Sequence, residues 1–423
     1  MIEGRRKMSD KGMIIRECKS LNASRRVFEG RIDSTNFFRT IRGDLLLTGG
    51  EARNQTLILD LIWNYLERKD IPTIILTSRL VILEGLQQEL NKDKSMNVIL
   101  SYPNQQNYHP FYGMSKQQFL RFIRMTAEEM GYSILMDQVM IYAAAVLEVV
   151  AMKYPISLPA VVNLLNEDDV FISEIALQEG LSNVIADNIR ANHEAGIVVR
   201  RLLERLEEIF EDIYISGSDT KYNLQSGVKG NLFGMVMYAC SSNQAILNSY
   251  LKEEVFYVLK YIPKVRIILD EMEFVDKDDE FMKYLSQLKR QQKIELVVVS
   301  QNIKDSTYGK ENLDFSNIVM FLHGSPGVTD NISRDLFGTY QYHKPVPVVV
   351  KPPHFFPTFK KSVQWQIQSE ERLRVRNEDF CVQSAILGKL TSYLAVKTTA
   401  NENVYLIRIS DFIPSRINVL PVI

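Results

Sequence analysis

Two neighbouring stretches decide the fold class: V-R-I-I-L-D-E-M-E-F at residues 265–274 and I-E-L-V-V-V-S-Q-N at residues 294–302. Each contains a short, continuous run of aliphatic and β-branched residues. The polar residues between them are numerous enough for one helix. Continuous apolar runs of this length are typical of strands that are buried on both faces. The two stretches therefore predict a strand–helix–strand unit in a mostly parallel α/β sheet.

Polar side chains follow both of these strands. Asp270 and Glu271 end the first strand, and Gln301 ends the second. Ligands of open α/β sheets bind beyond the carboxyl ends of the strands, so we expect these side chains near one another. Such a pair of acids suits a magnesium–nucleotide site, with Asp270 on hydrated Mg²⁺ and Glu271 polarising the attacking water. Gln301 would sense the γ-phosphate or orient that water.

The same two acids have a purely structural interpretation. Asp270 would then cap the following helix, because aspartate is a favoured residue at helix N-termini. Glu271 would simply be solvated. Both interpretations are compatible with the residues.

A second candidate site lies earlier in the chain, where a short apolar strand at residues 45–48 is followed by two glycines and a helix at residues 54–68. This is where the phosphate-binding pattern G-x-x-x-x-G-K-[ST] belongs. Residues 49–56 read G-G-E-A-R-N-Q-T, so Gly49 and Thr56 match, while Asn54 and Gln55 replace the glycine and the lysine. The candidate nucleotide-binding residues are Gly49, Gly50, Arg53, Asn54, Gln55 and Thr56.

The two replacements carry a physical cost for nucleotide binding. Asparagine tolerates positive φ better than other non-glycine residues, but not as well as glycine. Gln55 can donate a hydrogen bond, yet it cannot neutralise phosphate charge as lysine does. Arg53 could replace part of that charge, and Thr56 would share Mg²⁺ with Asp270. We expect weak or absent ATP binding; a degenerate turn between strand and helix is the alternative.

Composition limits the class of protein. The chain has 423 residues, a net charge of −1 and 46% hydrophobic residues, which indicates a globular protein of two or three domains. A bulk basic field for nucleic acid is excluded. Three dispersed cysteines fit a reducing cytosol and form no metal-binding spacing. Because no apolar run reaches about 20 residues, we expect no membrane-spanning segment and a cytoplasmic location.

The remaining pattern divides the chain into five segments. Helical periodicity predicts helices over residues 115–131, 133–153, 158–166, 172–190, 196–214 and 231–259. The prolines near residue 350 indicate extended chain on the surface. Residues 384–409 are expected to end in a hairpin at the sheet edge. The predicted domains are an irregular extension with one edge strand (1–28), two halves of an α/β core (29–114 and 260–412), an all-α insertion (115–259) and a tail (413–423).

In this arrangement the chain resembles the RecA-like P-loop ATPases of the FtsK/HerA superfamily, and most of all the TraG-type coupling ATPases of type IV secretion and conjugation. The resemblance rests on G-D-L-L-L-T-G-G at residues 43–50, N-Y-H-P-F at residues 107–111, I-I-L-D-E-M-E-F at residues 267–274, the strand ending in Gln301 and I-S-R-D-L-F-G at residues 332–338. It implies a RecA-like sheet with an all-α insertion, ATP and Mg²⁺ as ligands, and a hexamer that moves DNA or protein.

The resemblance leaves two functions open. One is an active, ATP-driven hexameric motor, which the retained Asp270 and Glu271 favour. The other is a degenerate subunit for assembly or cargo recruitment, which Asn54 and Gln55 favour. It would pair with itself or with an active ATPase paralogue in a secretion or conjugation membrane complex. Its location would then be cytoplasmic, peripheral at the inner face of the membrane.

Overall fold

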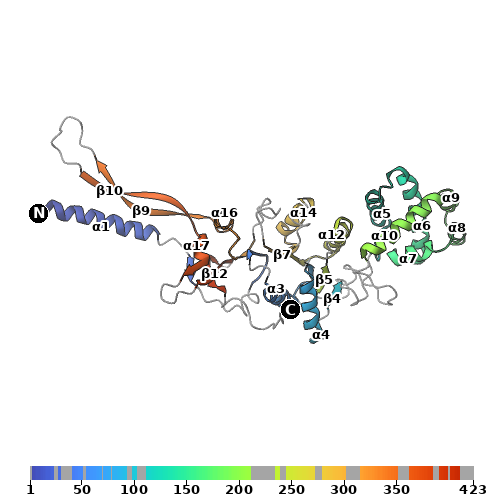
Figure 1. Cartoon of the computed structure of the whole chain (residues 1–423), viewed down its shortest axis with the longest axis horizontal. Helices are drawn as coiled ribbons and strands as arrows, with labels where there is room; N and C mark the ends of the chain where they lie inside the picture. Colours follow the sequence, from blue (N-terminus) through green and yellow to red (C-terminus); the bar gives the residue numbers. More distant parts are fainter. Residues whose placement is uncertain are drawn as a thin grey trace. The chain divides into compact units, whose positions relative to one another are not determined.

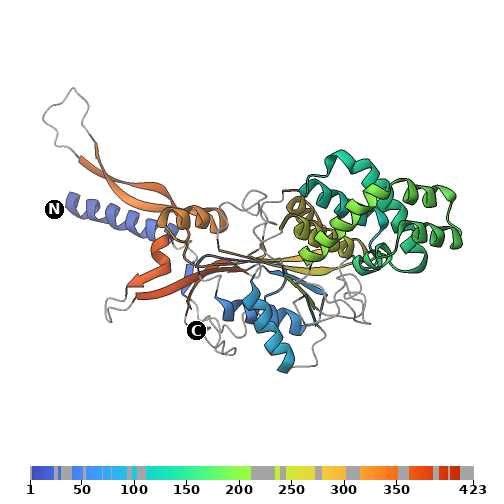
Figure 2. The same cartoon turned by 45° about the vertical axis from the view of Figure 1, so that its right-hand side comes forward.

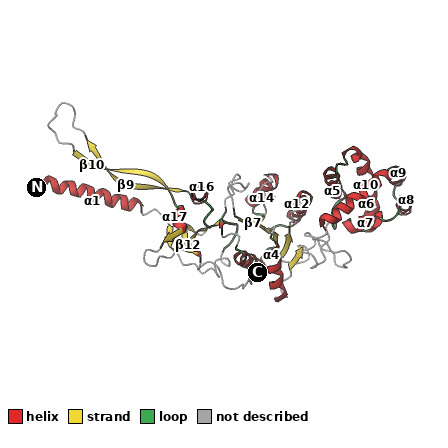
Figure 3. Cartoon of the chain, viewed as in Figure 1, coloured by secondary structure: helices red, strands yellow, loops and turns green. Residues whose placement is uncertain are grey.

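The computed structural model describes residues 2–22, 27–29, 41–50, 54–68, 70–77, 79–92, 98–101, 111–210, 234–238, 244–271, 279–301, 315–350, 362–383, 390–398 and 401–409. The chain divides into two compact units. Unit 1 comprises residues 1–57 and 298–418, and unit 2 comprises residues 58–297 and 419–423. Figure 1 follows the chain by sequence, and Figure 3 distinguishes its helices from its strands.

Unit 2 contains the predicted strand–helix–strand segment. Its strands follow the order β7-β6-β3-β5-β4, and β3 pairs in parallel with both β6 and β5. The strands are β3 (Thr73–Thr77), β4 (Val98–Ser101), β5 (Gly234–Tyr238), β6 (Val265–Asp270) and β7 (Ile294–Ser300), the last of which ends in unit 1.

Helices cover both faces of these strands. Figures 1 and 2 show α3 (Gln55–Arg68) and α4 (Leu80–Lys92) on one face, and α12 (Gln244–Tyr261) and α14 (Asp279–Arg290) on the other. Every residue of β3 and β6 is buried, as expected for strands covered on both sides. The predicted α/β class, a mostly parallel sheet flanked by helices, is confirmed.

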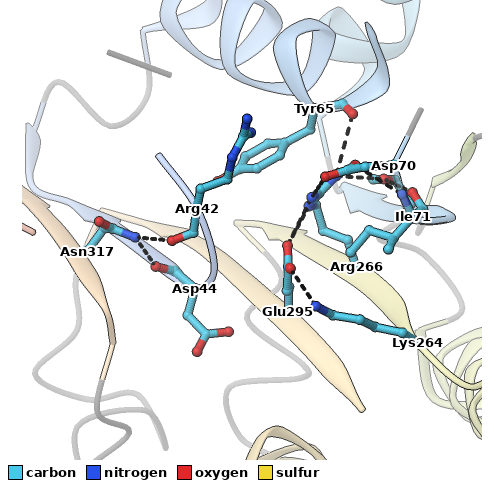
Figure 4. Close-up of polar contacts among 10 residues, drawn as sticks. Arg42, Asp44, Tyr65, Asp70, Ile71, Lys264, Arg266, Glu295 and Asn317 are labelled. Carbon is cyan, nitrogen blue, oxygen red and sulfur yellow. Dashed lines mark hydrogen bonds and ion pairs between the residues drawn. The ribbon is translucent and has the colours of Figure 1, made fainter. Parts of the chain in front are cut away.

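A buried arginine holds the amino end of β6. Arg266 is 1% exposed, and its guanidinium donates to Asp70 at 3.2 Å and to Glu295 at 2.9 Å while lying over the Tyr65 ring (Figure 4). Partial burial works against ionisation of Asp70, but the hydrogen bond and charge of Arg266 hold the pKa of that carboxyl below its usual range. Paired on two sides, the arginine fixes the start of the strand that ends in Asp270.

The long insertion folds into helices around α6. The elements are α5 (Lys116–Glu129), a 3₁₀ turn (Ser133–Leu135), α6 (Met136–Lys153), α7 (Leu158–Leu165), α8 (Asp169–Gln178), α9 (Asn183–Ala191) and α10 (His193–Phe210). Helix α6 contacts α5, α7, α8, α9 and α10. Residues 133–153 form the one described helix that is long and apolar enough to cross a membrane. Burial of Val139, Val146 and Val150 within the bundle accounts for much of this apolar character.

An aromatic cluster joins these helices to α12. Phe111 lies at the centre, fully buried, with its ring 4.8–5.2 Å from those of Phe119, Phe122, Phe210 and Tyr250. Its φ of 64° is unusual for a bulky residue, and its N–H donates to the Tyr250 hydroxyl at 3.2 Å. Of the predicted turn at residues 107–111, only Phe111 lies among the described residues.

Unit 1 is built on strands in the order β1-β13-β12-β8-β2. Strands β2 and β8 are parallel, whereas β12 is antiparallel to both β8 and β13. Its strands and helices are α1 (Ile2–Asn22), β1 (Val27–Glu29), β2 (Leu45–Thr48), β8 (Asn317–Met320), α16 (Pro326–Phe337), β9 (Thr339–Val350), β10 (Ser362–Leu373), α17 (Asn377–Phe380), β11 (Cys381–Gln383), β12 (Leu390–Thr398) and β13 (Asn401–Arg408). The predicted hairpin (β12–β13) and the edge strand β1 are confirmed.

Three expectations about local structure are wrong. The N-terminal extension is not irregular but contains the 21-residue helix α1. The single helix expected over residues 172–190 is divided at Gly180, whose φ of 78° ends α8. Residues 234–238 form β5 between β3 and β4 rather than a helix, because pairing on both sides outweighs an ambiguous apolar pattern. The domain boundaries stay predictions, although β5 lies inside the expected all-α segment.

The proline-rich segment is extended over residues 345–350, as expected, and the rest of it lies outside the described residues. The extended chain is part of the long hairpin β9–β10, which lies against α1. The N–H of His343 faces away from β10 and donates to Asn22 Oδ1 at 2.7 Å. Residues two apart in a strand direct their N–H groups alike, so Pro345 and Pro347 occupy positions where no ladder hydrogen bond is lost.

Candidate functional site

The carboxyl ends of β3 and β6 carry an ion pair. Thr77 and Asp270 are register partners on the two strands, and the Thr77 hydroxyl donates to Asp270 Oδ2 at 2.7 Å. Arg79, two residues beyond, donates from Nε to Oδ2 at 3.0 Å and from its terminal nitrogen to Oδ1. Asp270 is fully buried, and the Arg79 side chain is 16% exposed. Both oxygens of the predicted metal ligand therefore accept hydrogen bonds from one cation.

This pairing changes what Asp270 can do. The guanidinium compensates a carboxylate that has no access to water, which is the condition under which a buried charge is tolerated. A divalent cation at the same carboxylate would lie beside the positive charge of Arg79, and the two would repel each other. Magnesium binding at Asp270 thus requires Arg79 to move away.

Glu271, the predicted catalytic carboxylate, directly follows this ion pair. It is partly exposed, and its φ of 52° places it in the left-handed region, which is sparsely populated by residues other than glycine. The chain therefore turns sharply just after Asp270. Unusual backbone of this kind gathers at functional sites, and it is here that the sequence predicts chemistry.

The predicted phosphate loop begins with a closely packed glycine. Gly49 has a φ of 110°, and a Cβ there would lie 2.5 Å from the Phe321 carbonyl oxygen. The next residue, Gly50, donates its N–H to the Leu322 carbonyl at 3.0 Å. The first turn of the loop is thus held by the segment after β8, and the Gly50 amide is engaged by the protein itself.

The end of the loop is a capped helix terminus. Asn54 Oδ1 accepts a hydrogen bond from the Leu57 N–H at 3.2 Å, and α3 begins at Gln55. This is the geometry of an N-cap, in which a side chain satisfies one of the free amides of the first turn. Those amides are the groups that bind phosphate at a helix N-terminus, so Asn54 competes with an anion there.

The other predicted residues are placed as follows. Gln55 and Thr56 are half-buried in the first turn of α3, and Arg53 lies outside the described residues. Gln301 directly follows β7 and is half-buried. Residues 49–56 and Gln301 belong to unit 1, whereas Asp270 and Glu271 belong to unit 2.

Sequence reasoning missed Arg79 and Thr77. A signal was present: Arg79 follows directly on the predicted strand at residues 72–78, and that strand has no acidic residue at its end. Another unpredicted residue is His323 in unit 1. Its side chain is buried, and its Nε2 lies 3.5 Å from the Thr48 hydroxyl oxygen. Burial lowers the pKa of His323 to about 4.

Solved structures with this arrangement include the bacterial conjugative coupling protein TrwBdeltaN70. Its trigonal form, in complex with sulphate, has a TM-score of 0.51 at 14% identity, over 90% of this chain and 92% of that one. The chain has the fold of a conjugative coupling protein. The unbound monoclinic form of TrwBdeltaN70 gives a TM-score of 0.50 at 14% identity, over 86% of this chain and 84% of that one.

A third coupling-protein structure, plasmid coupling protein TrwB in complex with ADP and Mg²⁺, has a TM-score of 0.49 at 12% identity, over 90% of this chain and 92% of that one. No protein-family model matches the sequence, and no curated protein matches it. The likeness to coupling proteins is therefore one of fold.

Proposed function

We propose that the chain is an ATPase-like subunit of a conjugation- or secretion-type translocation machine. Its ATP hydrolysis is weak or absent, and it acts in assembly or in the recruitment of DNA or protein cargo. The coupling-protein fold supports the first part of the proposal. The bidentate pairing of Asp270 with Arg79 carries the second part, because it neutralises the one buried acid that the sequence assigns to magnesium.

Two further features, one residue identity and one contact, support weak or absent hydrolysis. Phosphoryl transfer depends on positive charge around the β- and γ-phosphates and on a bound Mg²⁺. Gln55 is neutral where a phosphate loop has lysine, and Asn54 caps the helix amide that would face the phosphate. This chain's own residues thus weaken three things that ATP hydrolysis needs. Gln55 removes positive charge at the phosphates, Asn54 occupies a helix amide, and Arg79 occupies the metal ligand Asp270.

The residues that remain can still hold a nucleotide loosely. Gly49, Gly50 and Thr56 would contact the phosphates, with Arg53 as a source of charge, and Thr56 and Asp270 would hold Mg²⁺ once Arg79 had moved. Glu271 would polarise the attacking water, and Gln301 would sense the γ-phosphate or orient that water. Bound Mg²⁺ would supply charge neutralisation. In this proposal the chain assembles with copies of itself, in a hexamer-type ring, or with an active ATPase paralogue, as a peripheral component at the inner face of the membrane.

The proposal is tested by titrating a fluorescent ATP analogue with Mg²⁺ against five forms of the chain. These are the wild type, Gln55→Lys, Arg79→Gln, the double variant Gln55→Lys/Arg79→Gln, and the control Arg290→Gln, which removes an exposed positive charge from the end of α14. We expect weak wild-type binding, unchanged in the control. The double variant should bind at least tenfold tighter than the wild type, because it restores the lysine and frees Asp270.

The alternative is an active motor, which is favoured by the presence of Asp270 and Glu271. It predicts micromolar binding and steady hydrolysis by the wild type. In that case Glu271→Gln would stop hydrolysis while retaining the nucleotide. This pattern would overturn the proposal of a disarmed site.

A further inference from the structure

Two short helices of unit 2 are apolar on two faces, although one face is enough for packing. In α7, Leu158, Val161 and Leu165 are buried in the bundle, while Leu164 lies on another face. In α8, Ile172 and Ala176 face inward, whereas Phe171 and Ile175, one turn apart, do not. A helix that is apolar beyond its core-facing stripe has a second surface to cover.

The second faces of α7 and α8 line one groove with the end of α6. Its volume is about 460 Å³, within the range of ligand-binding clefts. Val149 and Val150 of α6 lie at its base, and Pro159, Leu164, Phe171 and Ile175 line it. The rim is exposed and apolar, with Tyr154 62% exposed and Phe171 46% exposed. Large apolar side chains gathered at a hollow are typical of an interaction site rather than of an ordinary surface.

The charge around the groove is negative. Glu167 lines it, and a smaller hollow that shares Phe171 is lined by Asp168 and Glu174. The nearby cations do not offset these acids. Lys153 forms an ion pair with Glu179 at 2.7 Å, and Arg200 and His193, the latter lining the smaller hollow, both pair with Asp169. A bound segment therefore meets apolar walls beside carboxylates.

The floor of this region is held rigidly. Asp169, which is 6% exposed, accepts hydrogen bonds from the Tyr142 hydroxyl at 2.5 Å and from Arg200 at 2.8 Å, and His193 Nδ1 lies 2.5 Å from its other oxygen. Although desolvation opposes ionisation, these hydrogen bonds lower the pKa of Asp169. The start of α8 is thus fixed to α6 and α10, and Phe171 is presented from a stable support.

We propose that this groove binds a short segment of a partner protein in which a bulky apolar residue stands beside lysine or arginine. The apolar residue fills the hollow between α7 and α8, and the basic residues face Glu167, Asp168 and Glu174. The inference rests on the proposed recruiting role and specifies the chemistry of what is recruited. None of the groove residues belongs to the candidate nucleotide site.

The test begins with a random-peptide phage library selected on the full chain. A fluorescein-labelled peptide of the enriched sequence is then titrated by polarisation against the wild type, Phe171→Ala and Glu167→Lys. The matched controls are Val184→Ala, which truncates a 65% exposed apolar side chain on α9, and Glu128→Lys, which reverses an exposed charge on α5. All four substituted side chains are exposed, so circular dichroism should show the same fold throughout.

We expect enriched peptides that combine a bulky apolar residue with lysine or arginine. Their affinity should fall at least tenfold in Phe171→Ala and Glu167→Lys and stay within twofold in the two controls. Three results would overturn the proposal: no enrichment, enrichment of acidic or purely apolar peptides, or binding that the groove variants leave unchanged. Since nucleotide titrations involve other residues, a failure here is distinguishable from a failure of the proposed function.

Discussion

Removing Arg79 should destabilise the chain and at the same time make Asp270 able to bind magnesium. In Arg79→Ala the fully buried Asp270 keeps the hydrogen bond from the Thr77 hydroxyl but loses the guanidinium that pairs with it. Loss of one member of a buried ion pair typically costs about 3–5 kcal/mol. Because Arg79 is 16% exposed and water can enter its place, we expect the lower end, about 3 kcal/mol.

A double-mutant cycle isolates this interaction. Asp270→Asn removes the buried charge and should cost about 1 kcal/mol, since it leaves Arg79 near solvent with one weaker hydrogen bond. The double variant Arg79→Ala/Asp270→Asn should be more stable than Arg79→Ala alone. The two substitutions should therefore be non-additive by about 2 kcal/mol. Urea unfolding followed by fluorescence measures all four corners, and Arg290→Ala serves as an exposed control.

The same variants report on metal binding. Addition of MgCl₂ should raise the unfolding temperature of Arg79→Ala but not that of the wild type or of the double variant. At a magnesium concentration of one hundred times Kd, the gain in stability is about 2.7 kcal/mol. Additive substitutions would refute the structural role of the ion pair. Equal magnesium responses in the wild type and in Arg79→Ala would refute the claim that Arg79 blocks the metal ligand.

Three further predictions concern single side chains. Burial lowers the pKa of His323 to about 4, against about 6.5 when unfolded, so stability should be full well above pH 6.5 and fall by about 3 kcal/mol as the pH drops to 4. Urea unfolding at pH 7 and pH 5 should show about 2 kcal/mol of this loss in the wild type and much less in His323→Gln. Gly49→Ala, which forces a side chain at a φ of 110° against the Phe321 carbonyl, should cost roughly 2–4 kcal/mol in the same assay. Gly196→Ala places a Cβ 2.7 Å from the Tyr142 ring, and this clash should outweigh the gain in helix propensity and lower stability by about 1–2 kcal/mol. A neutral or stabilising effect would show that the ring can move.

Much of the fold follows from sequence pattern, for local reasons. The buried strands β2, β3, β6 and β7 were predictable because continuous β-branched runs have few other stable arrangements than a sheet covered on both sides. The start of α3 was predictable within one residue, and the stop of α16 at Gly338, with its φ of 76°, is a local property of glycine.

Other elements depended on contacts that no local pattern contains. The G-M-V-M-Y segment of β5 is a strand because β3 and β4 pair with it. Pro345 and Pro347 are tolerated in β9 because a backbone N–H at these positions would face away from β10, so no ladder hydrogen bond is lost. Only the register of β9 with β10 reveals this.

The candidate site divides in the same way. The sequence by itself determined the presence of Asp270, Glu271 and Gln301 after buried strands, and the absence of a lysine at Gln55, because these are facts of residue type and order. Only the tertiary structure decided that Asp270 is paired with Arg79, since the two residues are 191 positions apart and meet through the register of β3 with β6. It likewise decided that Asn54 caps α3 and that Gly50 donates to Leu322. Residue identity states which charges and donors exist; the folded chain determines which of them already bind one another.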